Sequence, residues 1–323
     1  MNPNSVYITD YVSRADVETS LLGKALSSEP HDKIEVLMVW HHQIDSDYLR
    51  QFPNLKGVVR YGVGYDNIDL VATRERGVFA CNTPDYGVDE VSDTAIAMIM
   101  AISRGIVRYD SLCRNYRANW QENTLNATRR GTEMTIGVIG AGRIGGSVLY
   151  KSKALGFQTV LYDPLKPSGH EKTFGAARTE TMDELLSLSD IVSVHVPLSP
   201  ESEGFIDTSF LAAMKAGSSL VNTARGMLVR DLEIFYEPLK SGKLNYVYLD
   251  VLPEEPPQDG PLISAWRSRE SWIDGRFLVN PHTAYYSGRA FFEMREKAAL
   301  NARRILEGKV PHNIVNGLTY EVC

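Results

Sequence analysis

Short apolar runs alternate with longer stretches of helical periodicity along almost the whole chain. Near the N-terminus, the runs at Val6–Thr9, Ile34–Trp40 and Leu55–Arg60 predict short buried strands with helical segments between them. Residues Asp89–Arg104 form a long apolar-rich stretch that predicts a buried helix. The segment from Tyr109 to Arg130 is polar and irregular. This strand–helix alternation predicts parallel sheets covered by helices.

The alternation restarts at Thr135, where the apolar run TIGVIG leads into a predicted helix over Arg143–Leu155. Thr181 and Glu184 have the spacing of a capping box, so we expect another helix to begin there. The chain therefore repeats its strand–helix order in a second region. The remaining strands that we predict there are Thr159–Asp163, Ile191–His195, Leu220–Thr223 and Val247–Val251.

The second half also contains less regular stretches. A helix predicted over Asp207–Ala216 ends at a glycine. Pro238 lies within the helical stretch Asp231–Lys240, where proline is expected to kink or shorten a helix. Residues Pro256–Asn280 contain no predicted strand, and loops of this length are often functional or interfacial. Beyond them, Gly288–Glu307 returns to a helical pattern.

Length and composition indicate the class of protein. A chain of 323 residues is too long for one ordinary hydrophobic core and fits two domains. With 43% hydrophobic and 23% charged residues, it has the composition of a soluble globular protein. Its longest apolar run, Ala95–Ile102, is far too short to cross a bilayer, and its first residues lack a secretory signal pattern. We expect a cytoplasmic protein that does not bind membranes.

Charge and cysteine content exclude further classes. The formal net charge of −6 argues against a general nucleic-acid surface, which needs a basic face. A small anion needs only local positive charge and stays a possible ligand. Cys81, Cys113 and Cys323 are odd in number and widely scattered, which fits neither a disulfide framework nor a metal site. We expect no metal and a reducing compartment.

The strongest motif is a glycine-rich turn between a predicted strand and a predicted helix. Gly140, Gly142 and Gly145 form G-x-G-x-x-G, which allows a tight turn, close approach to a pyrophosphate and close helix–strand packing. Free N–H groups at the helix start then face the phosphates, within reach of Arg143. Asp163 ends the next strand, where a carboxylate accepts hydrogen bonds from ribose hydroxyls and repels a 2′-phosphate. This spacing predicts binding of NAD rather than NADP.

Three polar residues in later loops have the chemistry that reduction of a keto acid needs. Arg225 has a planar fork of donors that matches a carboxylate and polarises a ketone. His282 is a proton donor, because histidine ordinarily titrates near pH of about 6.5. Glu255 would orient the imidazole and favour its protonated form.

Each of these residues has a plainer alternative when taken alone. Asp163 would then only cap a loop, with Lys166 offsetting its charge, and Arg143 would only be solvated. Arg225 would be a loop charge, and His282 a structural residue of a Pro-His turn. Glu255 would belong to a solvated acidic pair with its neighbour. Their joint occurrence behind a cofactor motif favours the functional interpretation.

A series of short motifs runs in order through most of the chain, from about residue 55 to 309. They are YGVGYDNID (61–69), CNTP (81–84), GVIGAGRIGG (137–146), YDP (162–164), HVPL (195–198), VNTARG (221–226), LDVLPEEP (249–256) and NPHTA (280–284). In these motifs the sequence resembles the D-isomer-specific 2-hydroxyacid dehydrogenases, a family that includes phosphoglycerate dehydrogenase, glyoxylate reductase and formate dehydrogenase.

The resemblance implies roles for individual residues. Arg225, Glu255 and His282 would be the catalytic set, and the backbone N–H groups of Val63 and Gly64 would bind the substrate carboxylate. Asp250 would bind the nicotinamide carboxamide. The backbone at Thr223 and Ala224 would contact the cofactor, and His195 would line the cofactor cleft. The set expected at the cofactor is Gly140, Gly142, Arg143, Ile144, Gly145, Asp163, His195, Val196, Pro197, Thr223, Ala224, Arg225, Asp250 and His282, and at the substrate Val63, Gly64, Arg225, His282 and Tyr285.

The resemblance also implies the architecture: two Rossmann-like α/β domains with doubly wound parallel sheets. The substrate domain would be discontinuous, comprising residues 1–103 and 290–323, and residues 104–289 would form the dinucleotide-binding domain. The substrate would bind in the cleft between them. Similar proteins pair through the dinucleotide domain, with the arm around Tyr109–Arg130 reaching the partner. We therefore expect a homodimer.

The implied activity is hydride transfer between NAD(H) and a small 2-keto acid or D-2-hydroxy acid. GYDNID and the stretch 285–298 are most similar to the corepressor branch of the family, the C-terminal-binding proteins. Tyr285 stands where that branch has a tryptophan, so its keto-acid preference does not carry over. Two alternatives stay open: an NAD(H)-dependent sensor or scaffold with little turnover, and a dehydrogenase of a non-carboxylate anion such as phosphite. The insertion before His282 would cover the cleft or extend a subunit contact.

Overall fold

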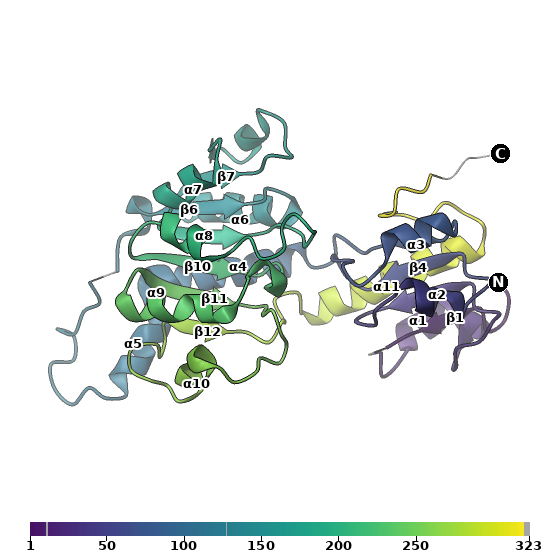
Figure 1. The fold of residues 1–323 in the computed structure, drawn as a ribbon, viewed down its shortest axis with the longest axis horizontal. Helices are drawn as coiled ribbons and strands as arrows, with labels where there is room; N and C mark the ends of the chain where they lie inside the picture. Colours follow the sequence, from purple (N-terminus) through teal and green to yellow (C-terminus); the bar gives the residue numbers. More distant parts are fainter. Residues whose placement is uncertain (11, 127, 320–323) are drawn as a thin grey trace. The chain divides into compact units, whose positions relative to one another are not determined.

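The chain folds into two compact units, each of which contains its own β-sheet (Figure 1). The computed structural model describes residues 1–10, 12–126 and 128–319, so Cys323 lies outside the described part. Unit 1 comprises Met1–Gly87 with Tyr286–Cys323, and unit 2 comprises Val88–Tyr285. All paired strands of both sheets are parallel, which confirms the predicted fold class of two parallel-sheet α/β domains.

Unit 1 is built on a five-stranded sheet of order β2-β1-β3-β4-β5. Helix α11 packs on β3 and β4 and also against α1. Leu49 of α2 and Ala72 of α3 belong to a separate cluster with Leu37 and Val58 of the sheet. The elements are β1 (Val6–Ile8), α1 (Asp16–Leu22), η1 (Gly23–Ala25), β2 (Leu26–Ser27), β3 (Val36–Val39), α2 (Ser46–Arg50), β4 (Gly57–Arg60), α3 (Leu70–Glu75), β5 (Phe79–Cys81) and α11 (Gly288–Leu306).

Local sequence determines where several of these helices begin. Asp45, Asp69 and Ser287 are N-caps of α2, α3 and α11, and each side chain accepts a hydrogen bond from the N–H three residues on. Along α11, the buried residues Ala298 and Ala302 lie four positions apart and therefore on one face. Their small side chains let the helix lie close to the sheet.

Unit 2 is built on a seven-stranded sheet of order β12-β11-β10-β9-β6-β7-β8. Strand β6 pairs with β9 on one side and with β7 on the other, so the chain order reverses direction at β6. A crevice for a ligand forms at such a switch point, beyond the carboxyl ends of the strands. The strands are β6 (Thr135–Ile139), β7 (Gln158–Tyr162), β8 (Ala177–Arg178), β9 (Ile191–Val194), β10 (Ser218–Asn222), β11 (Leu244–Leu249) and β12 (Phe277–Val279).

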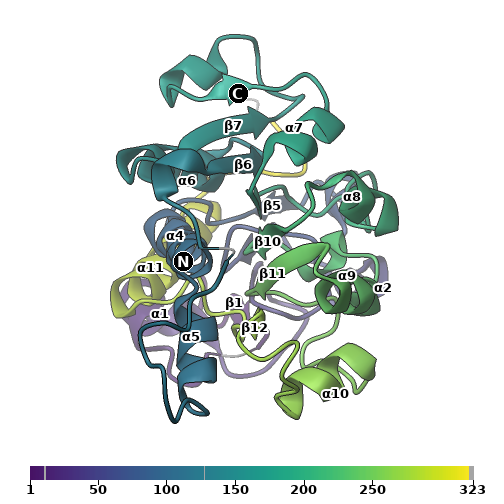
Figure 2. The same ribbon diagram turned by 90° about the vertical axis from the view of Figure 1, so that its left-hand side faces the viewer.

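Helices cover both faces of this sheet. Ile99 and Leu149, from α4 and α6, pack in one apolar cluster with Val138 of the sheet. Leu186 and Phe210, from α7 and α8, pack in the other. Figure 2 shows α4 and α6 on one side of the sheet and α7, α8 and α9 on the other. The helices are α4 (Val88–Arg104), α5 (Ile106–Cys113), α6 (Arg143–Ala154), α7 (Met182–Leu188), α8 (Thr208–Ala213), α9 (Tyr236–Ser241) and α10 (Pro261–Arg267), with 3-10 turns η2 (Gly131–Glu133), η3 (His170–Thr173), η4 (Gly226–Leu228) and η5 (Leu232–Phe235).

The segment Pro256–Asn280 contains regular structure, contrary to our prediction of a strandless insertion. It forms α10 and then β12, which pairs in parallel with β11. Leu262 and Ile273 of this segment are fully or almost fully buried in the core of unit 2. The apolar run of β12 is only three residues long, which is too short to identify from periodicity.

Two further segments differ from the predicted pattern. The region Tyr109–Arg130 begins inside α5 rather than in irregular structure. Around Pro238 the predicted single helix is divided into η5 and α9, and the proline lies in the first turn of α9, where no N–H is required. The helix is therefore shortened, as expected.

The unit limits also differ from the domain division drawn at residues 103 and 290. Helix α4 lies wholly in unit 2, because it packs on α6 and β10. Across residues 1–10, 12–126 and 128–319, no helix is long and apolar enough to cross a membrane. The same residues include no group of three or more His, Cys, Asp or Glu side chains arranged to hold a metal ion.

Candidate active site

The loops that follow the strands of unit 2 emerge along one edge of the sheet. Neighbouring strands end in register: Asn222 of β10 aligns with Val194 and Leu249, and Ile139 of β6 aligns with Val194 and Tyr162. The residues that follow six of these strands therefore form a row at the carboxyl edge, where open α/β sheets bind ligands. They are Gly140, Asp163, His195, Thr223, Asp250 and Asn280.

The glycine-rich turn has the shape that a dinucleotide needs. A Cβ atom on Gly145 would lie 1.9 Å from the carbonyl oxygen of Gly140, which itself has a φ of 87°, so this turn requires glycine at both positions. A Cβ on Gly142 would meet no atom within 4 Å, which leaves room for a ligand. Arg143 is exposed and Ile144 half-buried at the start of α6, where free N–H groups attract phosphate.

Asp163 is buried, and its carboxylate accepts hydrogen bonds from two backbone N–H groups. Its Oδ2 accepts a hydrogen bond from the N–H of Ala141 at 2.9 Å, and its Oδ1 accepts one from Leu165 at 3.0 Å. The carboxylate therefore caps its own loop and also fixes the glycine-rich turn. Each oxygen keeps a further lone pair for a ribose hydroxyl. The ribose contact stays a prediction, as does the influence of the half-buried Lys166.

The half-buried His195 and the buried Thr223 bring polar groups to the same edge. Burial lowers the pKa of His195 to about 3, so the imidazole is neutral, and its Nε2 lies 2.8 Å from the hydroxyl of Ser193. The Oγ1 of Thr223 is buried without a hydrogen-bond partner among the described residues. An unsatisfied buried hydroxyl is costly, so this atom is available to a ligand. Val196 is half-buried and Pro197 exposed in the loop after His195.

The loop that carries Arg225 is held rigidly. Asn222 donates from Nδ2 to the carbonyl of Arg225 and accepts from the N–H of Ala224, both at 2.9 Å. The guanidinium of Arg225 is half-buried and donates to the carbonyl of Ala224 at 2.8 Å. A Cβ on Gly226 would lie 1.8 Å from the carbonyl oxygen of Leu252. Glycine at this position therefore lets the Arg225 loop approach the loop after β11.

Glu255 and His282 form a direct pair. The Nδ1 of His282 lies 2.8 Å from Oε2 of Glu255, and Oε1 of Glu255 accepts a hydrogen bond from the N–H of Leu252 at 2.8 Å. Both oxygens of the carboxylate are therefore engaged. Because Nδ1 faces the carboxylate, Nε2 is the ring nitrogen that remains for a substrate.

The charges around Glu255 favour its ionised form. Burial by itself would raise the pKa of Glu255, but the hydrogen bond and charge of His282 lower it, as do the N–H of Leu252 and the charge of Arg225. The net effect holds the pKa below the ordinary carboxylate value. The side chains of His282 and Glu255 are 45% and 39% exposed, so the pair is open to a small solute.

Asp250 supports the loop that carries His282. Its Oδ1 accepts hydrogen bonds from Nδ2 of Asn280 and from the N–H groups of Thr283 and Ala284. The residue is 2% exposed, and this burial raises the pKa of Asp250. His282 has a φ of 54°, in the left-handed region that non-glycine residues seldom adopt. The hydrogen bonds to Asp250 hold that conformation, while its carboxamide contact stays a prediction.

Val63 and Gly64 lie in unit 1, in the loop that follows β4. Asn82 donates from Nδ2 to the carbonyl of Val63 at 2.7 Å, and Thr83 donates its N–H to the carbonyl of Gly62 at 2.9 Å. The carbonyls of this loop therefore point toward Asn82 and Thr83. The N–H groups of Val63 and Gly64 have no acceptor in the described part of the chain, which suits them to bind an anion.

Sequence reasoning missed several residues that position this site. Asn82, Asn222 and Asn280 each hydrogen-bond to a loop or carboxylate named above. All three lie inside quoted motifs, directly after a strand or at its end, and that placement is the signal that would have identified them. Tyr285 is half-buried directly after the NPHTA loop, and its contact with substrate stays a prediction.

Known proteins resemble this chain in sequence. Residues 96–284 match the model of the family described as "D-isomer specific 2-hydroxyacid dehydrogenase, NAD binding domain". A D-3-phosphoglycerate dehydrogenase from Methanocaldococcus jannaschii is 30% identical over 319 residues, covering 98% of this chain but only 58% of the relative. A glyoxylate reductase from Korarchaeum cryptofilum is 34% identical over 277 residues, covering 84% of this chain and 80% of the relative.

The fold is also shared with solved structures. D-lactate dehydrogenase from Aquifex aeolicus, crystallised with NAD and lactic acid, superposes with a TM-score of 0.83 at 26% identity and covers 97% of this chain and 100% of its own. A glyoxylate reductase from Paecilomyes thermophila gives a TM-score of 0.82 at 25% identity, and the match covers 98% of this chain and 99% of the reductase.

Proposed function

The chain belongs to the family of D-isomer-specific 2-hydroxyacid dehydrogenases, and we propose that it interconverts a small 2-keto acid and its D-2-hydroxy acid with NAD(H). It is thus an oxidoreductase with an NAD-binding domain over residues 96–284. The observation that carries the proposed chemistry is the 2.8 Å contact between His282 and Glu255, beside the charge of Arg225. An acid, the group that orients it and a cation are the parts that keto-acid reduction requires.

The residues at the edge of the unit 2 sheet fit NAD. Gly142 leaves room for a pyrophosphate at the start of α6, and Thr223 has a buried hydroxyl that lacks a partner within the described residues. The carboxylate of Asp163, directly after β7, would repel a 2′-phosphate, which favours NAD over NADP. When bound, NADH supplies the hydride that reduces C2 of the keto acid.

The protein's own residues would bind the acid and move one proton. Arg225 donates to the substrate carboxylate and polarises the ketone oxygen. Nε2 of His282 gives its proton to that oxygen, while Glu255 accepts a hydrogen bond from Nδ1 and favours the charged ring. By the family resemblance, the N–H groups of Val63 and Gly64 would also bind a substrate carboxylate. In the oxidative direction, His282 takes the proton back from the hydroxyl.

A substrate panel tests this function. NADH absorbance is followed with a series of 2-keto acids, and NAD reduction with the matching D- and L-hydroxy acids and with phosphite. We expect turnover with at least one 2-keto acid and with D- rather than L-hydroxy acids. Tight NADH binding with no turnover across the panel would instead identify a cofactor-dependent scaffold, and oxidation of phosphite alone would identify a different substrate class.

We also propose that the protein is a cytoplasmic homodimer that pairs through unit 2. Trp120 is 66% exposed and Ile106 59% exposed in and after α5, which leaves apolar area for a partner. Arg108 of this helix donates to the carbonyls of Ser271 and Asp274, so the insertion before β12 supports the arm. Sedimentation equilibrium tests the proposal: the mass should be that of two chains, and Trp120→Glu should shift it toward one.

A further inference from the structure

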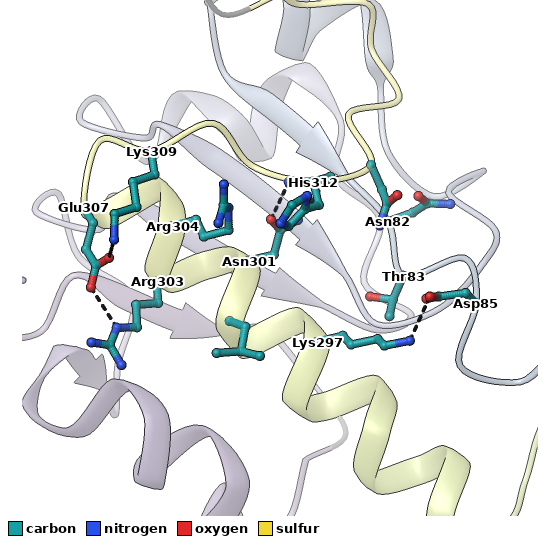
Figure 3. Close-up of a pocket in the computed structure, with 12 residues that line it drawn as sticks. Asn82, Thr83, Asp85, Lys297, Asn301, Arg303, Arg304, Glu307, Lys309 and His312 are labelled. Carbon is teal, nitrogen blue, oxygen red and sulfur yellow. Dashed lines mark hydrogen bonds and ion pairs between the residues drawn. The ribbon is translucent and has the colours of Figure 1, made fainter.

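Unit 1 contains a cavity of about 570 Å³ that the proposed chemistry does not use (Figure 3). Its walls are the second half of α11, the segment that follows α11, and the turn after β5. All of these elements belong to unit 1, so the shape of the cavity does not depend on unit 2. Its size lies within the range of about 300–1,000 Å³ that is typical of sites for small molecules.

Positive charge dominates the cavity wall. Four cationic side chains line it, and only two carboxylates, Asp85 and Glu307, oppose them. Four positive and two negative charges give a local excess of two, with His312 counted as neutral, although the whole chain carries a net charge of −6. A concave surface of one sign raises the local concentration of counter-ions. The four cations are Lys297, Arg303, Arg304 and Lys309.

Of these four cations, Arg304 alone forms no ion pair with a carboxylate of the described residues. Arg303 and Lys309 each bind Glu307 at 2.7 Å, and Lys297 binds Asp85 at 2.8 Å. Arg304 donates from Nε to the carbonyl of Val310 at 2.8 Å and pairs with no acid in the described part of the chain. It is half-buried, and Figure 3 draws it between the two groups of ion pairs. Its other donors are therefore suited to an anion from solution.

The base of the cavity is polar and well anchored. Asn301 is 5% exposed and makes two hydrogen bonds to the backbone of His312, at 2.9 Å to the carbonyl and 2.7 Å from the N–H. Asn82 and Thr83 are also buried there. An apolar ligand would bury the remaining donors of Arg304 without acceptors, whereas a polyanion would satisfy them.

Asn82 connects the cavity with the loop that holds Val63. Its N–H donates to the carbonyl of Asn313, which lines the cavity, at 3.2 Å. Its Nδ2 donates to the carbonyl of Val63 at 2.7 Å. A ligand that shifts the segment around Asn313 would therefore shift Asn82 and the anion-binding N–H groups of Val63 and Gly64. One residue thus takes part in both sites.

We propose that this cavity is an effector site for a small polyanion with at least two phosphate or carboxylate groups, held by Arg304 and its neighbouring cations. The bound anion acts through Asn82 on the Val63 loop and changes the apparent affinity for the substrate acid. The second part rests on the proposed function, because it assigns substrate binding to that loop. The first part is independent of it.

Calorimetric titration of the full chain tests binding. Pyrophosphate, tricarballylate and inorganic phosphate are titrated in the presence of saturating NADH, which occupies the glycine-rich turn. We expect one site that binds pyrophosphate or tricarballylate more tightly than phosphate, and the stronger of the two identifies the chemical group. Arg304→Gln should weaken binding at least about tenfold, as expected for loss of a charge-assisted hydrogen bond. Lys309→Gln, at an exposed position, should also weaken it.

Arg50→Gln is the matched control, because it removes one positive charge from unit 1 outside the cavity. Absence of binding, or equal binding to the wild type and Arg304→Gln, overturns the site. For the second part, KM for the keto acid is measured with and without pyrophosphate. We expect a change of about fivefold or more in the wild type and none in Arg304→Gln. An equal change in both would mean competition at the active site and would overturn the effector role.

Discussion

Nδ1 of His282 lies 2.8 Å from Oε2 of Glu255, although the two residues are 27 positions apart and belong to loops that follow β12 and β11. The parallel pairing of β11 and β12 brings these loops to the same edge. Asp250 then holds the His282 loop, and Leu252 holds the carboxylate of Glu255. Sheet register and the buried residues Asp250 and Leu252 therefore set the geometry of the pair.

Replacing His282 with asparagine should remove the proton donor without disturbing the backbone. Asparagine tolerates the left-handed conformation at φ 54° better than alanine does. We expect kcat for keto-acid reduction to fall by about 10²–10⁴, the usual scale of general acid–base help, with NADH affinity unchanged. Steady-state kinetics and NADH fluorescence measure both. His31→Asn, in unit 1, is the control, and an unchanged kcat would refute the assigned role.

Glu255→Gln should change the pH profile of reduction. Glutamine cannot ionise, so kcat/KM of the variant should lose the part of its acid-side decline that protonation of Glu255 causes in the wild type. Because the pKa of Glu255 is already lowered, the wild-type pair weakens only as pH falls through that lowered value. Glu254→Gln, a neighbouring exposed carboxylate, should leave the profile in place. The same acid-side decline in Glu255→Gln and in the wild type would contradict the assigned role of this carboxylate.

Asp250→Ala should destabilise unit 2 and reduce activity together. Its carboxylate accepts the N–H groups of Thr283 and Ala284, and leaving buried donors without acceptors costs about 1–3 kcal/mol. Burial raises the pKa of Asp250, so the folded wild type binds this proton more tightly than the unfolded chain. Its free energy of unfolding should therefore decrease as pH rises from the ordinary carboxylate pKa to the raised one.

Asp250→Asn is the matched variant for that test. It keeps an acceptor oxygen but cannot ionise, so it should be more stable than Asp250→Ala and should lose this part of the pH dependence. Urea unfolding at several pH values measures both quantities. Equal stability of the alanine variant and the wild type would show that the loop does not depend on Asp250.

Gly226→Ala should separate the Arg225 loop from the Glu255 loop. The new Cβ would lie 1.8 Å from the carbonyl oxygen of Leu252, a backbone atom that cannot move alone. We expect a loss of at least about tenfold in kcat/KM together with lower thermal stability, since overpacking typically costs about 1–3 kcal/mol. Gly288→Ala is the control, because its Cβ would meet nothing within 4 Å. Full activity of Gly226→Ala would show that the close approach is not needed.

Asp163→Asn should reduce the preference for NADH over NADPH. Asparagine keeps one acceptor oxygen, which can serve the N–H of Ala141 in the glycine-rich turn, but it loses the acceptor for Leu165 and the negative charge that repels a 2′-phosphate. We expect the ratio of kcat/KM for the two cofactors to fall by about tenfold. The ratio is measured at one keto-acid concentration. An unaltered ratio would mean that another residue selects the cofactor.

The local sequence was sufficient for a large part of the fold. Apolar runs predicted β1, β3, β4 and most strands of unit 2, because a buried parallel strand is continuously apolar. The three glycines of 140–145 identified the turn, because the close approach of Gly145 to Gly140 lies within the motif itself. Arg225, Glu255 and His282 were proposed as the catalytic residues from motifs of a family to which the chain belongs.

Other features depend on residues that are distant along the chain. Strand β12 was missed because three apolar residues are too few to predict a strand, and only its pairing with β11 defines it. Likewise, the burial of Asp250 beneath the 280–284 loop and the cavity around Arg304 arise where separate segments meet. Sequence alone determined the elements and the types of reactive group, because conformational preference and periodicity act over a few residues. Only the tertiary structure decided which of those groups face one another, because strand register and close packing bring distant residues together.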